Sequence, residues 1–241
     1  MVADGAGAGS TGPSGRDGPH TIVADLDHPE LSDDDRHHFA RVVRLRPGDA
    51  LTVSDGRGGW RPCRFGPELE PVGPAVLVPR PTPPIDIAFA LVKGQRPELV
   101  TQKLTELGAD VIRPFVAARS VVRWDATKAE AHTERLRRVA REACMQSRRC
   151  WLPEVCAPVP FAAIGALPGL TLAERTGGPL PLGGVVAIGP EGGWSAEELA
   201  AGHPTAGLGG HVLRAETAAI AAAVLLAAAR DRAAGPAAAA G

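Results

Sequence analysis

The chain has 241 residues, of which 44% are hydrophobic and 22% charged, and this composition is typical of a soluble globular protein. No apolar run reaches the ~20 residues of a membrane span, and the first residues lack the charged and apolar segments of a secretory signal. The four cysteines form no C-x-x-C pair, which argues against a disulfide scaffold and against a zinc site. We therefore expect a cytoplasmic protein with reduced thiols, and neither a membrane nor a metal ion as its partner.

The net charge of −1 conceals two basic segments. Residues 36–64 carry seven arginines against two acids, and residues 113–149 carry ten basic residues against four acids, whereas residues 1–35 are strongly acidic. Arginine accounts for 23 of the 26 basic residues, and its planar guanidinium suits phosphate groups. A GC-rich genome explains the preference for arginine but not the clustering, so both segments are candidates for contact with a nucleic acid.

Residues 1–19 are of low complexity and are expected to form a disordered tail. Short strands with Gly and Pro turns then suggest a small β-barrel over residues 20–80. Its predicted strands are residues 20–25, 50–54, 60–65 and 75–78, with a hairpin turn at 55–59 and a helix over 33–43 that Ser32 caps. Four prolines within residues 79–84 predict a stiff linker and the domain boundary.

Residues 85–232 alternate between strand and helix patterns, which predicts an α/β domain with a mostly parallel sheet. The predicted strands are residues 85–92, 110–116, 170–174, 184–189 and 211–213, and the predicted helices are 98–107, 129–149, a helix that Ser195 opens, and 217–232. The arginines of the helix over 129–149 lie mostly off its apolar stripe. Residues 233–241 are expected to form a second disordered tail.

The strongest local signal is the segment G-P-E-G-G-W-S at residues 189–195, between a predicted strand and a helix that begins with a capping box of Ser195 and Glu198. Glycines let the backbone approach a ligand closely, and ligands of open α/β sheets bind beyond the carboxyl ends of the strands. Neither a G-x-G-x-x-G pattern nor the lysine of a P-loop is present, so dinucleotides and nucleoside triphosphates have no support from a motif. A plain tight turn is the alternative interpretation.

A second Gly-bearing turn, L-G-G-H-V-L-R-A-E-T-A, follows at residues 208–218. Two such loops close in sequence can line one pocket. Arg214 and Glu216 are then candidates to act on a ligand there, although an exposed ion pair at a helix N-terminus is the alternative.

These two segments resemble those of the RsmE family, the bacterial 16S rRNA uridine-N3 methyltransferases of the SPOUT superfamily. Several further residues match motifs of that family along the chain. They are His38, Arg41, Val42, Arg44 and Pro47-Gly48; Lys93-Gly94, Gln102-Lys103, Glu106-Leu107-Gly108 and Arg119; and Ala143-Cys144, Gln146, Arg149 and Pro153-Glu154. The resemblance covers about residues 20–230. Ala215 and His211 depart from it, because the family usually has Thr and Arg at these positions.

The resemblance implies a SPOUT-type, mostly parallel α/β sheet with a C-terminal trefoil knot, preceded by a small PUA-like RNA-binding β-barrel. It implies a homodimer, S-adenosylmethionine as the cofactor, and 16S rRNA in the small (30S) ribosomal subunit as the substrate. The expected reaction is methylation of N3 of a specific uridine in that RNA. The acceptor is taken from the resemblance and not from chemistry visible in the sequence.

The two Gly-bearing segments, the basic segments and the resemblance together suggest roles for individual residues. Arg214 and Glu216 are the catalytic candidates, since a fixed guanidinium stabilises negative charge on the uracil and a carboxylate can hold an arginine or accept a proton. The cofactor-binding candidates are Leu172, Ala173, Glu174, Gly189, Pro190, Glu191, Gly192, Leu208, Leu213 and Thr217. The RNA-binding candidates are Arg41, Arg44, Arg119, Arg123 and Arg149.

Two alternatives of other classes remain open at this point. The chain could be a non-catalytic RNA-binding or ribosome-assembly factor that kept the fold, or an RNA methyltransferase with another acceptor, such as a ribose 2′-hydroxyl or a different base. Cofactor binding measured by calorimetry separates the first alternative from an enzyme. A small-molecule enzyme of general α/β type agrees less well with the basic segments.

Overall fold

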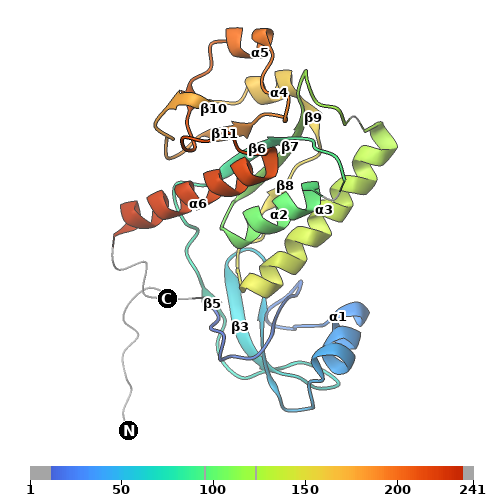
Figure 1. Cartoon of the computed structure of the whole chain (residues 1–241). Coiled ribbons are helices and arrows are strands. Elements are labelled where there is room, and N and C mark those ends of the chain that lie inside the picture. Colours follow the sequence, from blue (N-terminus) through green and yellow to red (C-terminus); the bar gives the residue numbers. More distant parts are fainter. Residues whose placement is uncertain (1–11, 95, 123, 236–241) are drawn as a thin grey trace. The chain divides into compact units, whose positions relative to one another are not determined.

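The computed structural model describes residues 12–94, 96–122 and 124–235 (Figure 1). The chain divides into two compact units. The first comprises Met1–Arg80, Cys144–Trp151 and Ala234–Gly241, and the second comprises Pro81–Ala143 and Leu152–Ala233. The break after Arg80 falls inside the proline-rich segment, but the sequence did not predict that residues from the long central helix would belong to the first unit.

The first unit contains a five-stranded sheet. Its strands are β1 (His20–Ile22), β2 (Ala50–Ser54), β3 (Gly59–Arg64), β4 (Glu70–Pro71) and β5 (Val76–Leu77). β2 and β3 form the predicted hairpin, β1 runs parallel to β2, and β4 and β5 both pair antiparallel with β3. Side chains at alternate positions of the strands, such as Leu51, Val53 and Cys63, fill the core of this unit. β4, which has only two residues, was not predicted.

The predicted helix over 33–43 is two helical pieces of different pitch. Ser32 caps α1 (Asp33–His37) as expected, because its Oγ accepts a hydrogen bond from the N–H of Asp35 at 3.1 Å. The chain continues as the π-helix η1 (His38–Val43) and ends at Arg44 in the left-handed conformation, with φ of 64°. The wider π turn leaves Val42 66% exposed, so this short helix presents apolar and basic side chains together to solvent.

The last turn of α3 (Ala126–Ser147) and the residues after it belong to the first unit. The indole N–H of Trp151 donates to the carbonyl oxygen of Val78 at 3.0 Å, and the N–H of Gly58 donates to that of Cys150 at 2.8 Å. Trp151 also forms an isolated bridge with Arg57. These contacts hold residues 144–151 against β3 and β5.

The second unit contains a seven-stranded sheet in which every pair is parallel, as the alternation of strands and helices predicted. The order is β12 (Thr205–Ala206), β10 (Leu170–Gly178), β11 (Val185–Ile188), β6 (Asp86–Ala90), β7 (Val111–Val116) and β8 (Glu154–Val155), and β9 (Val159–Pro160) also pairs with β7. β10 and β11 are neighbours, so the loops that follow them emerge at the same edge of the sheet.

Helices cover both faces of this sheet (Figure 1). Ile87 and Phe89 of β6 face one side, where they pack with α2 (Arg96–Glu106), α3 and α6 (Ala215–Ala234). Ala88 and Ala90 face the other side, together with Ile164 of α4 (Phe161–Gly165). Successive residues of a strand point to opposite faces, so the side chains of β6 contribute to the hydrophobic cores on both faces of the sheet.

A buried ion pair fixes the far end of α6. Arg230 Nη1 lies 2.9 Å from Asp110 Oδ2, and the two side chains are 8% and 1% exposed. The same carboxylate oxygen accepts a hydrogen bond from the N–H of Ile85 at 2.9 Å, and Arg230 also donates to the carbonyl oxygen of Gly108. The ion pair therefore joins the end of α6 to backbone groups just before β6 and β7.

The second unit also differs from the predicted elements. Residues 211–213 do not form a strand; they are irregular chain, and Val212 is 87% exposed. The edge strand is instead β12, a few residues earlier, where Thr205 and Ala206 pair with β10. The pattern H-V-L resembles a strand, but its valine has no sheet to pack against. β8, β9 and α4 were not predicted, because elements of two to five residues carry too short a pattern.

Candidate functional site

The Gly-rich loop after β11 is held in place by its tryptophan. Trp194 is 5% exposed, its ring stacks 6.1 Å from that of Phe115 with an interplanar angle of 5°, and its indole N–H donates to the carbonyl oxygen of Ala173 at 3.0 Å. The loop then enters α5 (Ala196–Ala200) through the predicted capping box, in which Ser195 and Glu198 each bond the backbone N–H of the other. The loop is therefore fixed both by the buried ring of Trp194 and by the capping box of Ser195 and Glu198.

Glu198 also has a partner outside its own helix. Its Oε1 accepts the backbone N–H of Ala118 at 2.8 Å, while its Oε2 accepts the N–H of Ser195. Arg119, the next residue, donates from Nη1 to the carbonyl oxygen of Gly192 at 2.9 Å. The segment after β7 is therefore bonded to the Gly-rich loop at two points.

The two Gly-bearing loops line a single pocket of about 250 Å³ beside the middle of β10 and the carboxyl end of β11. We call it the loop pocket. Its lining comes from three segments: Ala173, Glu174 and Arg175 of β10; Ile188, Gly189, Pro190, Glu191, Gly193 and Trp194; and Leu208, Gly209, His211, Val212, Leu213, Ala215 and Ala218. The lining combines apolar side chains with exposed backbone, which suits a flat apolar ring that carries polar edges.

Close packing in this pocket depends on glycine at position 189. A Cβ on Gly189 would lie 3.0 Å from the ring of Trp194, which is itself buried and hydrogen-bonded. A side chain at this position would therefore have to displace the tryptophan or enter the pocket.

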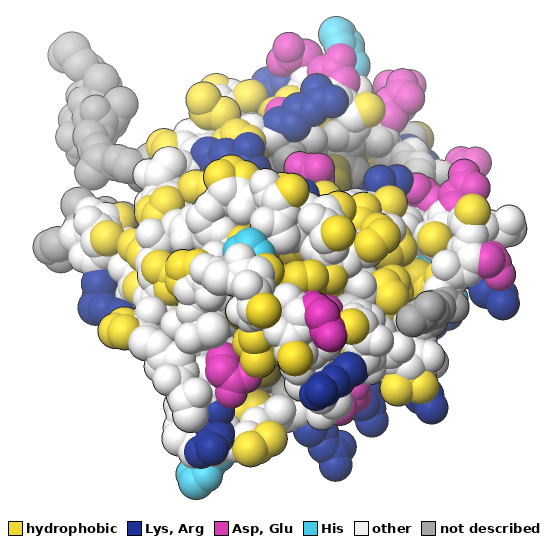
Figure 2. Space-filling model, turned by 90° about the horizontal axis from the view of Figure 1, so that it is seen from above, with side chains coloured by type: hydrophobic (Ala, Val, Ile, Leu, Met, Phe, Trp, Pro, Cys, Tyr) yellow, Lys and Arg dark blue, Asp and Glu magenta, His cyan; other side chains and the backbone are white. Residues whose placement is uncertain are grey.

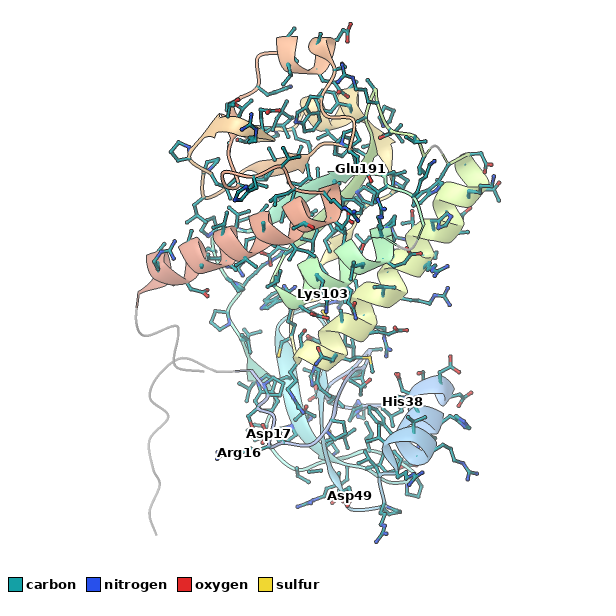
Figure 3. All side chains as sticks on the ribbon, in the orientation of Figure 1. Arg16, Asp17, His38, Asp49, Lys103 and Glu191 are labelled. Carbon is teal, nitrogen blue, oxygen red and sulfur yellow. The ribbon has the colours of Figure 1, made fainter. Side chains whose placement is uncertain are left out.

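An arginine that the sequence did not single out joins the two loops. Arg96, the first residue of α2, places Nη1 2.6 Å from Glu191 Oε1 and Nε 3.8 Å from Glu216 Oε1. Glu191 accordingly lies near the N-terminal ends of α2 and α6 (Figure 3). The guanidinium is 40% exposed, whereas the Glu216 side chain is only 14% exposed. No helix pattern reveals such a contact, because the three residues are far apart in the sequence.

A second pocket, of about 370 Å³, shares Glu191 with the loop pocket. We call it the basic pocket. It is lined by Leu91, Val92, Lys93, Arg96, Val121, Val122, Glu191 and Arg214, so three cationic groups face one carboxylate. Figure 2 shows one face of the molecule, on which basic and acidic side chains lie around a hollow.

Comparison with known proteins shows the family of this chain. Residues 79–227 match a model of the RNA methyltransferase domain, and residues 31–66 match the RNA methyltransferase PUA domain. The ribosomal RNA small subunit methyltransferase E of Mycobacterium bovis is 34% identical over 215 residues, which cover 77% of this chain and 80% of that protein. The chain belongs to the ribosomal RNA small subunit methyltransferase E family.

Solved structures agree with this membership. A ribosomal RNA small subunit methyltransferase E from Neisseria gonorrhoeae, bound to S-adenosyl methionine, has a TM-score of 0.74 and 25% identity, over 88% of this chain and 97% of that one. A methyltransferase from Legionella pneumophila, also bound to this cofactor, has a TM-score of 0.76 and 27% identity, over 87% and 97% of the two chains. The predicted α/β fold with an N-terminal PUA domain is confirmed.

Seven of the ten cofactor-binding candidates of this family member line the loop pocket: Ala173, Glu174, Gly189, Pro190, Glu191, Leu208 and Leu213. The other three do not. Leu172 is completely buried in the core, Gly192 faces Arg119, and Thr217 is exposed on α6. Arg175, Trp194 and Ala215 line the pocket without having been predicted. For Trp194 the signal was available, because it follows directly after the Gly-rich segment.

The two catalytic candidates have different surroundings. Arg214 lines the basic pocket, and no carboxylate of the described residues forms an ion pair with it. Glu216 pairs with Arg96, and its Oε2 is buried without a hydrogen-bond partner among the described residues. This geometry therefore does not support the alternative in which Arg214 and Glu216 form an exposed ion pair with each other.

The RNA-binding candidates fall in both units. Arg41 and Arg44 are exposed at η1 and Arg149 is half-buried, all three in the first unit, while Arg119 belongs to the second. Arg123 lies outside the described residues. Burial raises the pKa of the Cys144 thiol to about 11, which fits the prediction that this residue belongs to the core.

Within residues 12–94, 96–122 and 124–235, no cluster of His, Cys, Asp and Glu has the geometry to hold a metal ion. In the same described part of the chain, no helix is long and apolar enough to cross a bilayer.

Proposed function

We propose that the protein transfers a methyl group from S-adenosylmethionine to N3 of a specific uridine in 16S rRNA. The observation that carries this proposal is the meeting of residues 189–194 and 208–218 in one pocket. Relatives with this name and a solved member of the family bound to S-adenosyl methionine support the cofactor and the RNA.

The residues of the loop pocket fit this cofactor. Leu208, Leu213 and Ile188 offer apolar contacts to an adenine ring, and the backbone around Gly189 and Gly193 offers hydrogen bonds to its polar edge. The carboxylate of Glu174 supplies negative charge to a ligand that carries a sulfonium and an amino group, whereas Glu191 lines the pocket with its carboxylate paired to Arg96. Leu172, Gly192 and Thr217 would then contribute through the backbone and by shaping the walls.

When bound, the cofactor supplies an electrophilic methyl group: the N3–carbon bond forms as the carbon–sulfur bond breaks, the sulfur keeps the electron pair, and the N3 proton ultimately passes to solvent. The protein aligns the acceptor and excludes water from the reacting atoms. Arg214 stabilises the negative charge that develops on the uracil as its proton leaves. Glu216 contributes from the first turn of α6, where its carboxylate forms an ion pair with Arg96.

The acceptor base must leave any stack or pair before its N3 is accessible. Arg41, Arg44 and Arg149 of the first unit, with Arg119 and Arg123, hold the RNA through its phosphates. The exposed Val42 and Val43 lie beside the first two arginines, so η1 combines phosphate contacts with an apolar surface.

We include a homodimer, the trefoil knot, a cytoplasmic location and the 30S subunit as substrate in this proposal. Membership in the family supports the knot and the small subunit. The dimer is supported by apolar side chains that stand exposed on and before α6: Val212 at 87%, Val224 at 46% and Leu225 at 44%. Val212 also lines the loop pocket, so a second copy that covers it would help to enclose the cofactor.

The decisive experiment combines purified protein, S-adenosylmethionine with a labelled methyl group, and 30S subunits from cells that lack the endogenous enzyme. Mass spectrometry of the digested RNA is expected to find label on N3 of one uridine. Label on a ribose 2′-oxygen or on another base would assign a different acceptor. Cofactor binding without any transfer would favour a non-catalytic RNA-binding factor.

A further inference from the structure

We propose that Arg96 is a positioning residue that engages Glu191 and so leaves Arg214 available to the acceptor base in the basic pocket. The inference rests on the proposed function in one respect only, namely that the basic pocket receives the base. It concerns a residue that neither Gly-bearing loop contains.

The charged groups of the basic pocket are unequally paired. The basic pocket has Lys93, Arg96 and Arg214 as cations and Glu191 as its carboxylate. Within this pocket an ion pair of 2.6 Å joins Glu191 Oε1 to Arg96 Nη1. Arg214 has no carboxylate partner among the residues that the structure describes. One cation is therefore occupied, and another faces the pocket without an acidic partner.

Arg96 is itself held by a second carboxylate. Its Nε lies 3.8 Å from Glu216 Oε1, and the Glu216 side chain is largely buried. A guanidinium presents several donors in a rigid plane, so it can engage two carboxylates at once. The order Glu191–Arg96–Glu216 ties the Gly-rich loop to the first turn of α6.

Loss of the Arg96 guanidinium would leave Glu191 to the other cations of the pocket. Glu191 would then face Arg214 and Lys93 across the same pocket, and a carboxylate beside Arg214 would cancel the positive charge that the deprotonating uracil needs. Arg96 therefore acts through Glu191 and not on the substrate. Lysine at position 96 could pair with one carboxylate but not with two, so it would preserve part of the effect.

The test uses four variants: Arg96→Ala, Arg96→Lys, Glu191→Gln and the double variant Arg96→Ala/Glu191→Gln. At saturating S-adenosylmethionine, Arg96→Ala is expected to lower kcat at least about tenfold, while KM for 30S subunits and the Kd of the cofactor change by less than about threefold. Arg96→Lys should fall between wild type and Arg96→Ala. The double variant should be faster than Arg96→Ala alone, because the competing carboxylate is gone.

Arg135→Ala is the matched control. Arg135 pairs with Glu98 at 2.9 Å and is 48% exposed, similar to Arg96, but lines neither pocket. Its loss should leave kcat within about threefold of wild type. If the double variant is as slow as Arg96→Ala or slower, the two losses reflect a structural role and the proposal is wrong.

A second measurement needs neither RNA nor cofactor. In the protein labelled with ¹⁵N-arginine, the side-chain Nε–Hε signal of Arg214, assigned through Arg214→Lys, should shift in Arg96→Ala and return towards its wild-type position in the double variant. An unmoved signal would overturn the proposal. If wild type labels an atom other than uridine N3, the proposed acceptor fails, yet this signal still decides the role of Arg96.

Discussion

The indole N–H of Trp194 donates to the carbonyl oxygen of Ala173 across 3.0 Å, and so bonds the loop after β11 to its neighbouring strand β10. Both residues line the loop pocket. This hydrogen bond therefore helps to set the shape of the pocket, and it joins two residues that are 21 positions apart in the sequence.

Trp194→Phe is expected to weaken cofactor binding about five- to tenfold, because a phenyl ring can still stack on Phe115 but leaves the Ala173 carbonyl without its donor. Calorimetric titration with S-adenosylmethionine measures the change. Trp151→Phe is the matched control, since it removes an equivalent indole bond to the Val78 carbonyl in the first unit. Equal losses of affinity in both variants would show that the effect is general destabilisation.

Gly189→Ala is expected to weaken cofactor binding at least about tenfold, because its Cβ would lie 3.0 Å from the fixed ring of Trp194. Gly178→Ala in β10 is the control, since its Cβ would meet the Thr205 carbonyl oxygen at an ordinary 3.8 Å. The same titration compares the two. Unchanged affinity in Gly189→Ala would remove this wall from the cofactor site.

Arg41→Ala and Arg44→Ala are each expected to weaken RNA binding and to reduce the slope of log K against log salt concentration by about one. Filter binding of a 16S rRNA fragment between low and moderate salt gives the slope. Arg232→Ala, which removes an exposed charge near the end of α6, should leave the slope unchanged. A slope that stays at the wild-type value in Arg41→Ala and Arg44→Ala would mean that neither side chain contacts phosphate.

His20 predicts a pH dependence of stability. Burial, with a smaller effect of Arg148, lowers the pKa of His20 from 6.5 to about 4, and its ring nitrogens lie 2.8 and 3.0 Å from the hydroxyls of Thr52 and Ser54. The folded protein thus binds the proton less readily than the unfolded chain, so stability is complete above pH 6.5 and falls as the pH drops towards 4. From pH 7 to pH 5 the expected loss is about 2 kcal/mol.

Urea unfolding at pH 7 and pH 5 measures this loss. His20→Asn cannot take up the proton, so the difference between the two pH values should shrink by about 2 kcal/mol in that variant. His28→Asn is the control, because His28 is an exposed residue. The same pH dependence in wild type and His20→Asn would assign the effect to other groups.

The sequence predicted the elements whose patterns are long or capped. The parallel sheet, the hairpin of β2 and β3, and the capping box of Ser195 and Glu198 all follow from periodicity or from local side-chain chemistry, and the structure confirms them. Residues 211–213 were wrongly predicted as a strand because Val212 has the composition of one, although its exposure is set by tertiary structure.

The candidate site was predictable only where glycine spacing marked it. Residues 189–193 and 208–213 were found through their turns, and the resemblance to a family added β10. Arg96 was out of reach, because its partners Glu191 and Glu216 come from other elements and only folding brings the three together. Ala215 is buried and lines the loop pocket, so at this position the chain presents a methyl group where the resemblance to the family led us to expect the hydroxyl of a threonine.

The anchoring of Arg230 to Asp110 has a consequence for how much of the C-terminus can be removed. From Glu216 to Arg230 the helix α6 is rigid and spans about 21 Å. The Arg230–Asp110 ion pair at its C-terminal end therefore sets the position of the first turn, where Glu216 pairs with Arg96. A chain shortened after Ala234 keeps this ion pair. A chain shortened before Arg230 leaves the buried Asp110 carboxylate without its partner Arg230, and α6 is then free to change its orientation. Such a truncation, although far from the pocket, is then expected to lower catalytic activity before it unfolds the domain.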